Sequence, residues 1–280
     1  MRGVAAVCLL AMLVIVGCGG GDDDNDTAVE RIAFERGDPT SPSVLVSNAD
    51  GTGQQTIISD ARDPALRRDG QAVAFARGPD IFLVNVNGTG LTNLTNNNSL
   101  NAFASSPAYS QFADRIAYVL TPTDDDGEEG VPTVRLMDAD GSDDVLLVTG
   151  GDEPSFDPSG GRIAFVSGPD LFLIRTNGTD LVQLTFHDTN LEAHSPSFSP
   201  FGDRIIFELS PSPSIFTIGT DGRGETELVD SGADPSVNQF GNRIAFARGG
   251  SIFSTNIIGT DQRQLTSGPD DRNPSWSGSL

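Results

Sequence analysis

The chain has 280 residues, of which 39 are acidic and 17 basic, so its formal net charge is −22 at pH 7. Hydrophobic residues make up 37% of the sequence, enough to build a core, which excludes a wholly disordered chain. The excess of carboxylates argues against nucleic acid as a partner, because phosphate recognition needs clusters of basic residues. Abundant glycine and proline, without a long stretch of helical periodicity, exclude a mainly helical protein.

The N-terminal residues are typical of a targeting sequence. An apolar run over residues 4–16 is too short to cross a bilayer but suits the core of a signal peptide. The run ends in Ile-Val-Gly-Cys at residues 15–18, which resembles a bacterial lipobox, where lipid is attached to the cysteine and cleavage occurs just before it. Residues 1–17 are therefore predicted to be a lipoprotein signal peptide, with Cys18 as the lipidation site. An ordinary signal peptide with an incidental cysteine is the alternative.

Residues 18–30 are rich in glycine and aspartate, which predicts a flexible acidic tether. Removal of the signal peptide would also remove Cys8 and leave Cys18 as the remaining cysteine, so the fold must hold without a disulfide bond. These features predict a lipid-anchored protein of the cell envelope. If the cell has two membranes, the glycine after Cys18 favours the periplasmic side of the outer membrane, by analogy with lipoprotein sorting.

From Arg31 onward, a unit of about forty residues repeats along the chain. Two copies read EPSFDPSGGRIAF at residues 153–165 and SPSFSPFGDRIIF at residues 195–207. The proline that opens each copy recurs six times, at Pro64, Pro107, Pro154, Pro196, Pro235 and Pro274.

Each unit predicts four short antiparallel strands. The first strand contains the proline, then alanine or serine, then an apolar residue, and the small residue suits crowding around an axis. The second is of the Arg-Ile-Ala-Phe type. The third is aliphatic and aromatic, as at residues 81–84 and 171–174, and the fourth follows, as at residues 91–95 and 181–185. Asp-Gly or Asn-Gly turns between the third and fourth strands suit tight hairpins.

Four strands repeated at this period are the signature of a β-propeller blade. The repeats begin at a second strand and end with a lone first strand at residues 273–277. That C-terminal strand is predicted to complete the N-terminal blade, which gives an all-β, six-bladed propeller over residues 31–280 with no exposed sheet edge. Trp276 is then expected to be buried beside Phe34.

The repeats, the Asn-Ala-Asp-Gly-Thr-Gly turn at residues 48–53 and the Gln-Leu-Thr motifs at residues 183–185 and 264–266 resemble the propeller repeats of the TolB family. The resemblance covers residues 31–277. It implies a six-bladed propeller and a protein-binding role in the periplasm. It does not imply TolB's own task, because TolB carries an additional N-terminal α/β domain that the residues before Arg31 do not resemble. Similar repeats also occur beside the hydrolase domain of prolyl-oligopeptidase-type enzymes.

Sequence motifs for metal binding are weak. His187 and His194 fall in one predicted inter-blade loop with Asp188 and Glu192, but zinc ligands usually lie closer together in sequence, so a polar surface loop is favoured. The turn at residues 138–143 departs from the calcium-binding pattern, which leaves hairpin formation as its explanation and Ca²⁺ as a minor candidate. No cofactor is predicted.

The residue before the first-strand proline is acidic on alternate blades, at Asp63, Glu153 and Asp234. These carboxylates are expected to ring one mouth of the channel and to attract cations or basic groups. The alternative is that aspartate before proline simply starts a turn.

The predicted topology places long connections on the same face, at residues 96–105, 186–194 and 121–132. The last of these is an acidic insert. Together with the mouth carboxylates it forms the candidate binding rim, because variable loops on a rigid scaffold often bind ligands. The insert contributes Asp124, Asp125, Asp126, Glu128 and Glu129.

The sequence therefore favours a monomeric, non-enzymatic lipoprotein that binds a protein or peptide, with basic groups, through this acidic face. It would touch the membrane through its lipid anchor. The alternative is a propeller enzyme acting on glycans or lactones, with Asp63, Glu153 and Asp234 as acids or metal ligands.

Overall fold

The computed structural model describes residues 30–97, 101–110, 112 and 114–277. The predicted signal peptide, Cys18 and the tether up to residue 29 lie outside the described residues. None of the described segments is a helix long and apolar enough to cross a membrane.

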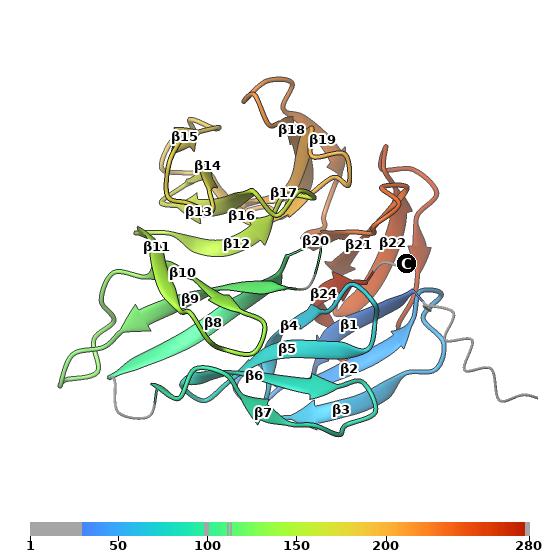
Figure 1. Ribbon diagram of the computed structural model, residues 1–280. Helices are drawn as coiled ribbons and strands as arrows, with labels where there is room; N and C mark the ends of the chain where they lie inside the picture. The colour runs from blue at the N-terminus through green and yellow to red at the C-terminus, as the bar shows by residue number, and fades with distance from the viewer. Residues whose placement is uncertain (1–29, 98–100, 111, 113, 278–280) are drawn as a thin grey trace, which may run out of the picture.

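The repeats form six antiparallel sheets of four strands each, arranged around a common axis (Figure 1). This confirms the predicted six-bladed propeller. We number the blades 1 to 6 by their second strands, and call the strands of each blade A to D from the axis outward.

Blades 1 to 3 carry the first half of the chain and the last strand. Blade 1 contains β24 (Arg272–Trp276), β1 (Arg31–Arg36), β2 (Ser43–Asn48) and β3 (Gln55–Ser59). Blade 2 contains β4 (Arg62–Leu66), β5 (Ala72–Arg77), β6 (Asp80–Asn85) and β7 (Thr92–Asn93). Blade 3 contains β8 (Ala102–Tyr109), β9 (Arg115–Pro122), β10 (Thr133–Asp138) and β11 (Val145–Thr149).

Blades 4 to 6 carry the second half. Blade 4 contains β12 (Asp152–Phe156), β13 (Arg162–Ser167), β14 (Asp170–Arg175) and β15 (Val182–Gln183). Blade 5 contains β16 (Glu192–Phe198), β17 (Arg204–Ser210), β18 (Ser214–Gly219) and β19 (Thr226–Val229). Blade 6 contains β20 (Ala233–Val237), β21 (Arg243–Arg248), β22 (Ser251–Asn256) and β23 (Arg263–Gln264).

The core lies between neighbouring blades. The aromatic residue that closes each Arg-Ile-Ala-Phe run is at most 2% exposed, and truncating such a residue typically costs about 3–5 kcal/mol. In blade 2 this ring stacks on the next strand, with 5.9 Å between the centroids of Phe75 and Phe82. The six aromatic residues are Phe34, Phe75, Tyr118, Phe165, Phe207 and Phe246.

The C-terminal strand closes the ring as predicted. β24 pairs antiparallel with β1, with Trp276 opposite Ile32, and Ser277 Oγ accepts the N–H of Arg31 at 2.9 Å. Trp276 is 8% exposed and belongs to the same apolar cluster as Phe34. Residues far apart in sequence therefore form a single sheet, which Figure 1 shows where β24 lies beside β1.

Some outer strands are shorter than the sequence suggested. β7, β15 and β23 have two residues each, because the following Leu-Thr pair leaves the ladder. In blade 2, Leu94 turns inward to 7% exposure, and Thr95 Oγ1 accepts the N–H of Ile81 at 3.1 Å. The threonines of the two Gln-Leu-Thr motifs, Thr185 and Thr266, accept the N–H groups of Leu171 and Ile252 in the same way and so take the place of a backbone acceptor.

All three predicted long connections are partly strand. In blade 3 the acidic insert extends β9 to Pro122. Pro122 pairs with Ala102, so β8 begins at Ala102, inside the first predicted connection. The chain beyond continues the hairpin through a bridge between Thr123 and Glu129. Similarly, β16 begins at Glu192, so His194 lies in a strand rather than in a loop.

Candidate functional site

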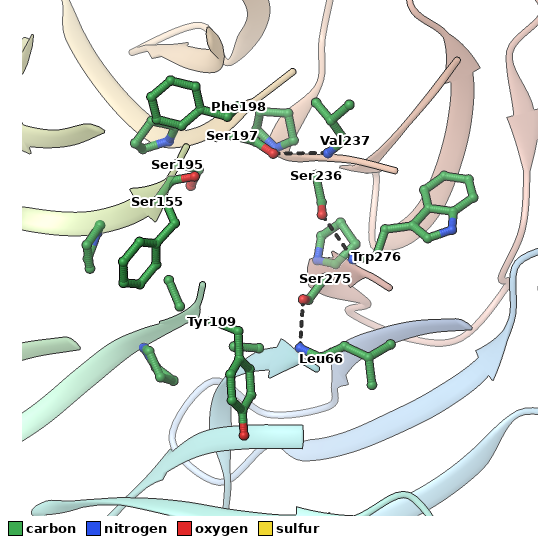
Figure 2. A pocket seen from close by; sticks show the side chains of 18 of the residues that line it. Leu66, Tyr109, Ser155, Ser195, Ser197, Phe198, Ser236, Val237, Ser275 and Trp276 are labelled. Carbon is green, nitrogen blue, oxygen red and sulfur yellow. Dashed lines mark hydrogen bonds between the residues drawn. The ribbon is translucent and has the colours of Figure 1, made fainter. Parts of the chain in front are cut away.

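The six A strands enclose a channel with a cavity volume of about 390 Å³ (Figure 2). The small residue after each proline has two roles here. It allows the strands to crowd around the axis, and in three of the four blades where it is serine its Oγ accepts a backbone N–H from the next blade. Three such bonds, of 2.9–3.0 Å, join Leu66 to Ser275, Val237 to Ser197 and Trp276 to Ser236.

At one end of the channel, all six A strands contain the same distortion. The residue before the proline has a positive φ of 48–53°, a conformation that non-glycine residues seldom adopt. The register with strand B shifts at the same point in each blade. The residues are Asp63, Ser106, Glu153, Ser195, Asp234 and Asn273.

The three predicted mouth carboxylates each bind the distorted backbone of the next blade. Asp63 accepts the N–H of Ser106 at 3.2 Å, and Asp234 accepts that of Asn273 at 3.1 Å. Glu153 accepts the N–H of Ser195 at 2.5 Å. All three carboxylates line the channel cavity. The sequence therefore placed these side chains at one mouth correctly, and the structure adds that they also join neighbouring blades.

Three further carboxylates were not identified from the sequence. Glu35, Asp152 and Glu208 accept the backbone N–H groups of Asp63, Glu153 and Asp234, at 2.7, 2.7 and 3.0 Å. Glu35 and Glu208 follow the Arg-Ile-Ala-Phe type run of their blades. A signal was present, because the other four repeats have alanine or valine at this position.

Burial and crowding change the acidity of the mouth. Desolvation, followed by repulsion from Glu35, raises the pKa of Asp63 to about 6. Desolvation also raises the pKa of Asp234 to about 6, with a smaller contribution from Glu208. The pKa values of Asp152 and Glu208 are raised too, chiefly by burial.

Positive groups offset part of this charge. Arg272 Nε lies 2.9 Å from Glu35 Oε2, and Arg62 Nε lies 3.6 Å from Asp63 Oδ2. His194 Nδ1 lies 3.7 Å from Glu153 Oε1, and its pKa is raised first by hydrogen bonding to Glu153. Six carboxylates face two arginines and one histidine, so the mouth keeps an excess of negative charge at neutral pH.

The acidic insert does not join this ring. Asp124, Asp125, Asp126, Glu128 and Glu129 are exposed on the β9–β10 connection, and the described cavity is lined by other residues. Asp124 Oδ1 instead accepts the N–H groups of Asp126 and Glu128 within its own turn, at 3.0 and 2.8 Å. The candidate rim is therefore two separate acidic regions.

The two histidines contact different carboxylates. His187 lies 3.6 Å from Asp170 and 3.3 Å from Glu225, whereas His194 contacts Glu153 and Glu192. Within the described part of the chain, no group of three or more His, Cys, Asp or Glu side chains is placed to hold a metal ion. The two histidines of the predicted loop therefore belong to different groups of carboxylates.

A second hollow meets the channel mouth at Asp234. Its cavity volume is about 800 Å³, and it runs over the ends of blades 5, 6 and 1. The lining combines prolines such as Pro211 and Pro213 with Arg248, whose guanidinium lies 4.9 Å from the centroid of the Phe246 ring. The acidic channel mouth therefore lies beside this hollow, which we call the groove and which has both apolar and charged residues in its lining.

Comparison with known proteins gives the fold but no sequence family: no family model matches, and no curated protein sequence matches. TolB from Acinetobacter baumannii has a similar structure, with a TM-score of 0.73 and 18% identity over 91% of this chain and 68% of that one. A putative TolB from Agrobacterium tumefaciens has a TM-score of 0.67 and 13% identity, covering 88% of this chain and 91% of that one.

Other solved structures share the fold. A nidogen/laminin complex gives a TM-score of 0.68 and 11% identity, covering 89% of this chain and 98% of that one. An oligogalacturonate lyase in complex with manganese gives 0.57 and 10%, covering 86% of this chain and 82% of that one. At these identities the likeness shows the fold, and this chain has the six-bladed propeller architecture seen in TolB propeller domains.

Proposed function

We propose that this protein is a membrane-anchored lipoprotein of the cell envelope whose propeller binds a protein or peptide carrying basic groups. The observation that carries the proposal is the ring of carboxylates at one channel mouth: Asp63, Glu153 and Asp234 line the channel, and three further carboxylates behind them add to the negative charge. Carboxylate rings of this kind attract cations and raise the encounter rate with basic partners.

The groove beside the mouth supports a peptide rather than a single cation as the ligand. It is contiguous with the channel at Asp234, and its prolines offer apolar surface next to the acidic ring. A basic side chain placed at Asp63, Glu153 or Asp234 would meet a carboxylate while the rest of an extended peptide lay in the groove. The nidogen/laminin complex, whose fold this chain shares, contains a protein partner.

The test compares two triple variants with the same change in net charge. Asp63→Asn/Glu153→Gln/Asp234→Asn neutralises the mouth and keeps side-chain oxygens that can accept the backbone N–H groups. Asp124→Asn/Asp125→Asn/Asp126→Asn neutralises the insert. Binding of the full chain to a fluorescent arginine-rich peptide, and to its glutamate-rich counterpart, is measured by anisotropy at several salt concentrations.

We expect the arginine-rich peptide to bind the unmodified protein and the insert variant, and to lose affinity for the mouth variant. Added salt should weaken the binding, since screening reduces the attraction between exposed charges. Equal loss of affinity in both triple variants would indicate attraction to net charge alone and would contradict a site at the mouth.

A further inference from the structure

The face opposite the acidic mouth carries apolar side chains at the tips of turns. In the turns between strands A and B of blades 5 and 6, the tip residues Phe201 and Phe240 are 84% and 53% exposed. The same position holds Asp69 in blade 2 and Ser159 in blade 4, which form hydrogen bonds within their own turns. A phenylalanine makes no such bond and exposes its ring to water.

Phenylalanine also holds this position in blade 3, where Phe112 is 69% exposed, and blade 6 carries a further apolar tip on this face. The tip of its turn between strands C and D is Ile258, which is 68% exposed. In the five other blades the tip is aspartate or asparagine, whose side chain accepts the backbone N–H two residues later. Blade 6 therefore has an exposed isoleucine where the repeat otherwise has a turn-stabilising polar residue. The five polar tips are Asp50, Asn87, Asp140, Asn177 and Asp221.

We call the exposed side chains of Phe201, Phe240 and Ile258 the apolar face, because all three lie at turn tips on the side of the ring away from the acidic mouth. A Cβ added at Gly241, next to Phe240, would lie 3.9 Å from Cε2 of Phe201, so the two turns are neighbours. Because strands alternate in direction, the A–B and C–D turns lie on the same side of the ring. Exposed apolar side chains gathered on one face commonly mark an interaction site.

The N-terminal segment enters the propeller beside this face. The side chain of Glu30, the first described residue, accepts the Nδ2–H of Asn238 at 3.1 Å, and Asn238 opens the turn that carries Phe240. The backbone oxygen of Glu30 accepts the N–H of Ala49 at 3.1 Å. Eleven residues separate Glu30 from Cys18, and an extended chain of that length spans at most about 40 Å.

We infer that the apolar face is the membrane-facing surface of the propeller, with Phe201, Phe240 and Ile258 contacting the interfacial region of the bilayer. Aromatic and aliphatic side chains on an exposed face are suited to the boundary between headgroups and acyl chains. The inference rests on the anchor predicted at Cys18 and not on the ligand of the acidic mouth.

The charge distribution favours this orientation. With a net charge of −22, the protein is repelled by anionic lipids, so we expect an uncharged phospholipid surface to be preferred. The carboxylate ring lies on the opposite side, and docking through the apolar face would leave that ring open to a partner away from the membrane.

The experiment places single tryptophans on the two faces of the full chain, reconstituted with its anchor in phosphatidylcholine vesicles. Phe240→Trp reports on the apolar face, and Phe186→Trp, at a residue that is 80% exposed on the opposite side, is the matched control. Bromine in the lipid acyl chains quenches the emission of tryptophans that approach them. The unmodified protein, with Trp276 alone, gives the background.

We expect the emission of Phe240→Trp to shift to shorter wavelength and to be quenched by brominated lipid, while Phe186→Trp stays unquenched. Adding Phe201→Ser and Ile258→Asn, residue types that other blades carry at these positions, should reduce the quenching. Phosphatidylglycerol in the vesicles should reduce it as well.

Three outcomes would overturn the inference: equal quenching of both tryptophans, quenching of neither, or failure of the full chain to remain on the vesicles. A blue shift of Phe240→Trp that depends on protein concentration without lipid would assign the apolar face to a second copy of the chain instead. Loss of peptide binding at the acidic mouth would leave this result unchanged, so the two proposals fail separately.

Discussion

Replacing Asp234 with asparagine should stabilise the protein at neutral pH and lose that advantage in acid. Burial raises the pKa of this carboxyl from 3.8 to about 6. An acid whose pKa rises on folding stabilises the folded state while it is protonated. Its contribution is therefore fully present below pH 3.8 and is lost as the pH rises through about 6. Asparagine carries no charge, and its side-chain oxygen can still accept the N–H of Asn273.

The size of the effect follows from the shift. About two pKa units at 1.36 kcal/mol per unit give roughly 3 kcal/mol as an upper value for Asp234. Because water enters the cavity and screens the neighbouring carboxylates, we expect a gain of about 1–2 kcal/mol at pH 8. Near pH 4 the two proteins should differ by less than about 0.5 kcal/mol.

Urea unfolding followed by circular dichroism at pH 4, 6 and 8 measures this difference directly. Asp140→Asn is the control, because Asp140 lies on an exposed turn and blades 2 and 4 have asparagine at that position. Hydrogen bonds from Ser142 lower the pKa of Asp140, so its neutralisation should bring no gain at pH 8. Lower stability of Asp234→Asn at pH 8 would show that the ionised carboxylate is favourable in the fold and would refute the reasoning.

Three further predictions concern the ring and its anchor. Trp276→Ala should cost about 3–5 kcal/mol in chemical unfolding. Trp276→Phe should cost much less, because the buried Nε1 has no hydrogen-bond partner among the described residues and blades 4 and 5 have phenylalanine at this position. Ser275→Ala should cost about 1–3 kcal/mol by leaving the N–H of Leu66 unpaired, and an unchanged urea midpoint would contradict that bond. Cys18→Ser should release the protein from the membrane fraction or leave it uncleaved, and a mutant of mature size that stays membrane-bound would exclude the lipid anchor.

The fold could be predicted because each repeat contains the same local signals. Proline followed by a small residue, the Arg-Ile-Ala-Phe run and the Asp-Gly turn recur at one period. A strand that is ambiguous in one copy can therefore be assigned from the same strand in the other copies. The closure by β24 followed from the lone first strand at the C-terminus. The short β7, β15 and β23 could not be foreseen, because Thr95 and its counterparts replace backbone acceptors with a side-chain oxygen.

The site was predicted in part. Alternation of acidic residues before the proline correctly indicated one mouth, since those positions are equivalent in every blade. Glu35 and Glu208 were missed because a single charged residue after an apolar run looks like the exposed end of a strand. The insert containing Asp124 lies on a connection of the predicted face, but it extends β9 and closes its own turn, so its charges do not line the channel.

The carboxylate ring also shows why its charge occurs on alternate blades. The distorted residues before proline leave six backbone N–H groups at the mouth, and each is bound by a carboxylate. Blades 2, 4 and 6 supply the acceptor for the next blade from Asp63, Glu153 and Asp234 themselves. The N–H groups of Asp63 and Asp234 are bound by Glu35 and Glu208, which lie in strand B of the preceding blade. Strand B of blade 3 has Val119 at the equivalent position, so the N–H of Glu153 is bound by Asp152. The pattern of carboxylates and backbone N–H groups at the mouth therefore repeats every two blades, three times around the ring. An apolar substitution in this ring would remove charge and orphan a buried N–H together, whereas an amide would remove the charge alone, so amide variants separate the ring's binding role from its structural one.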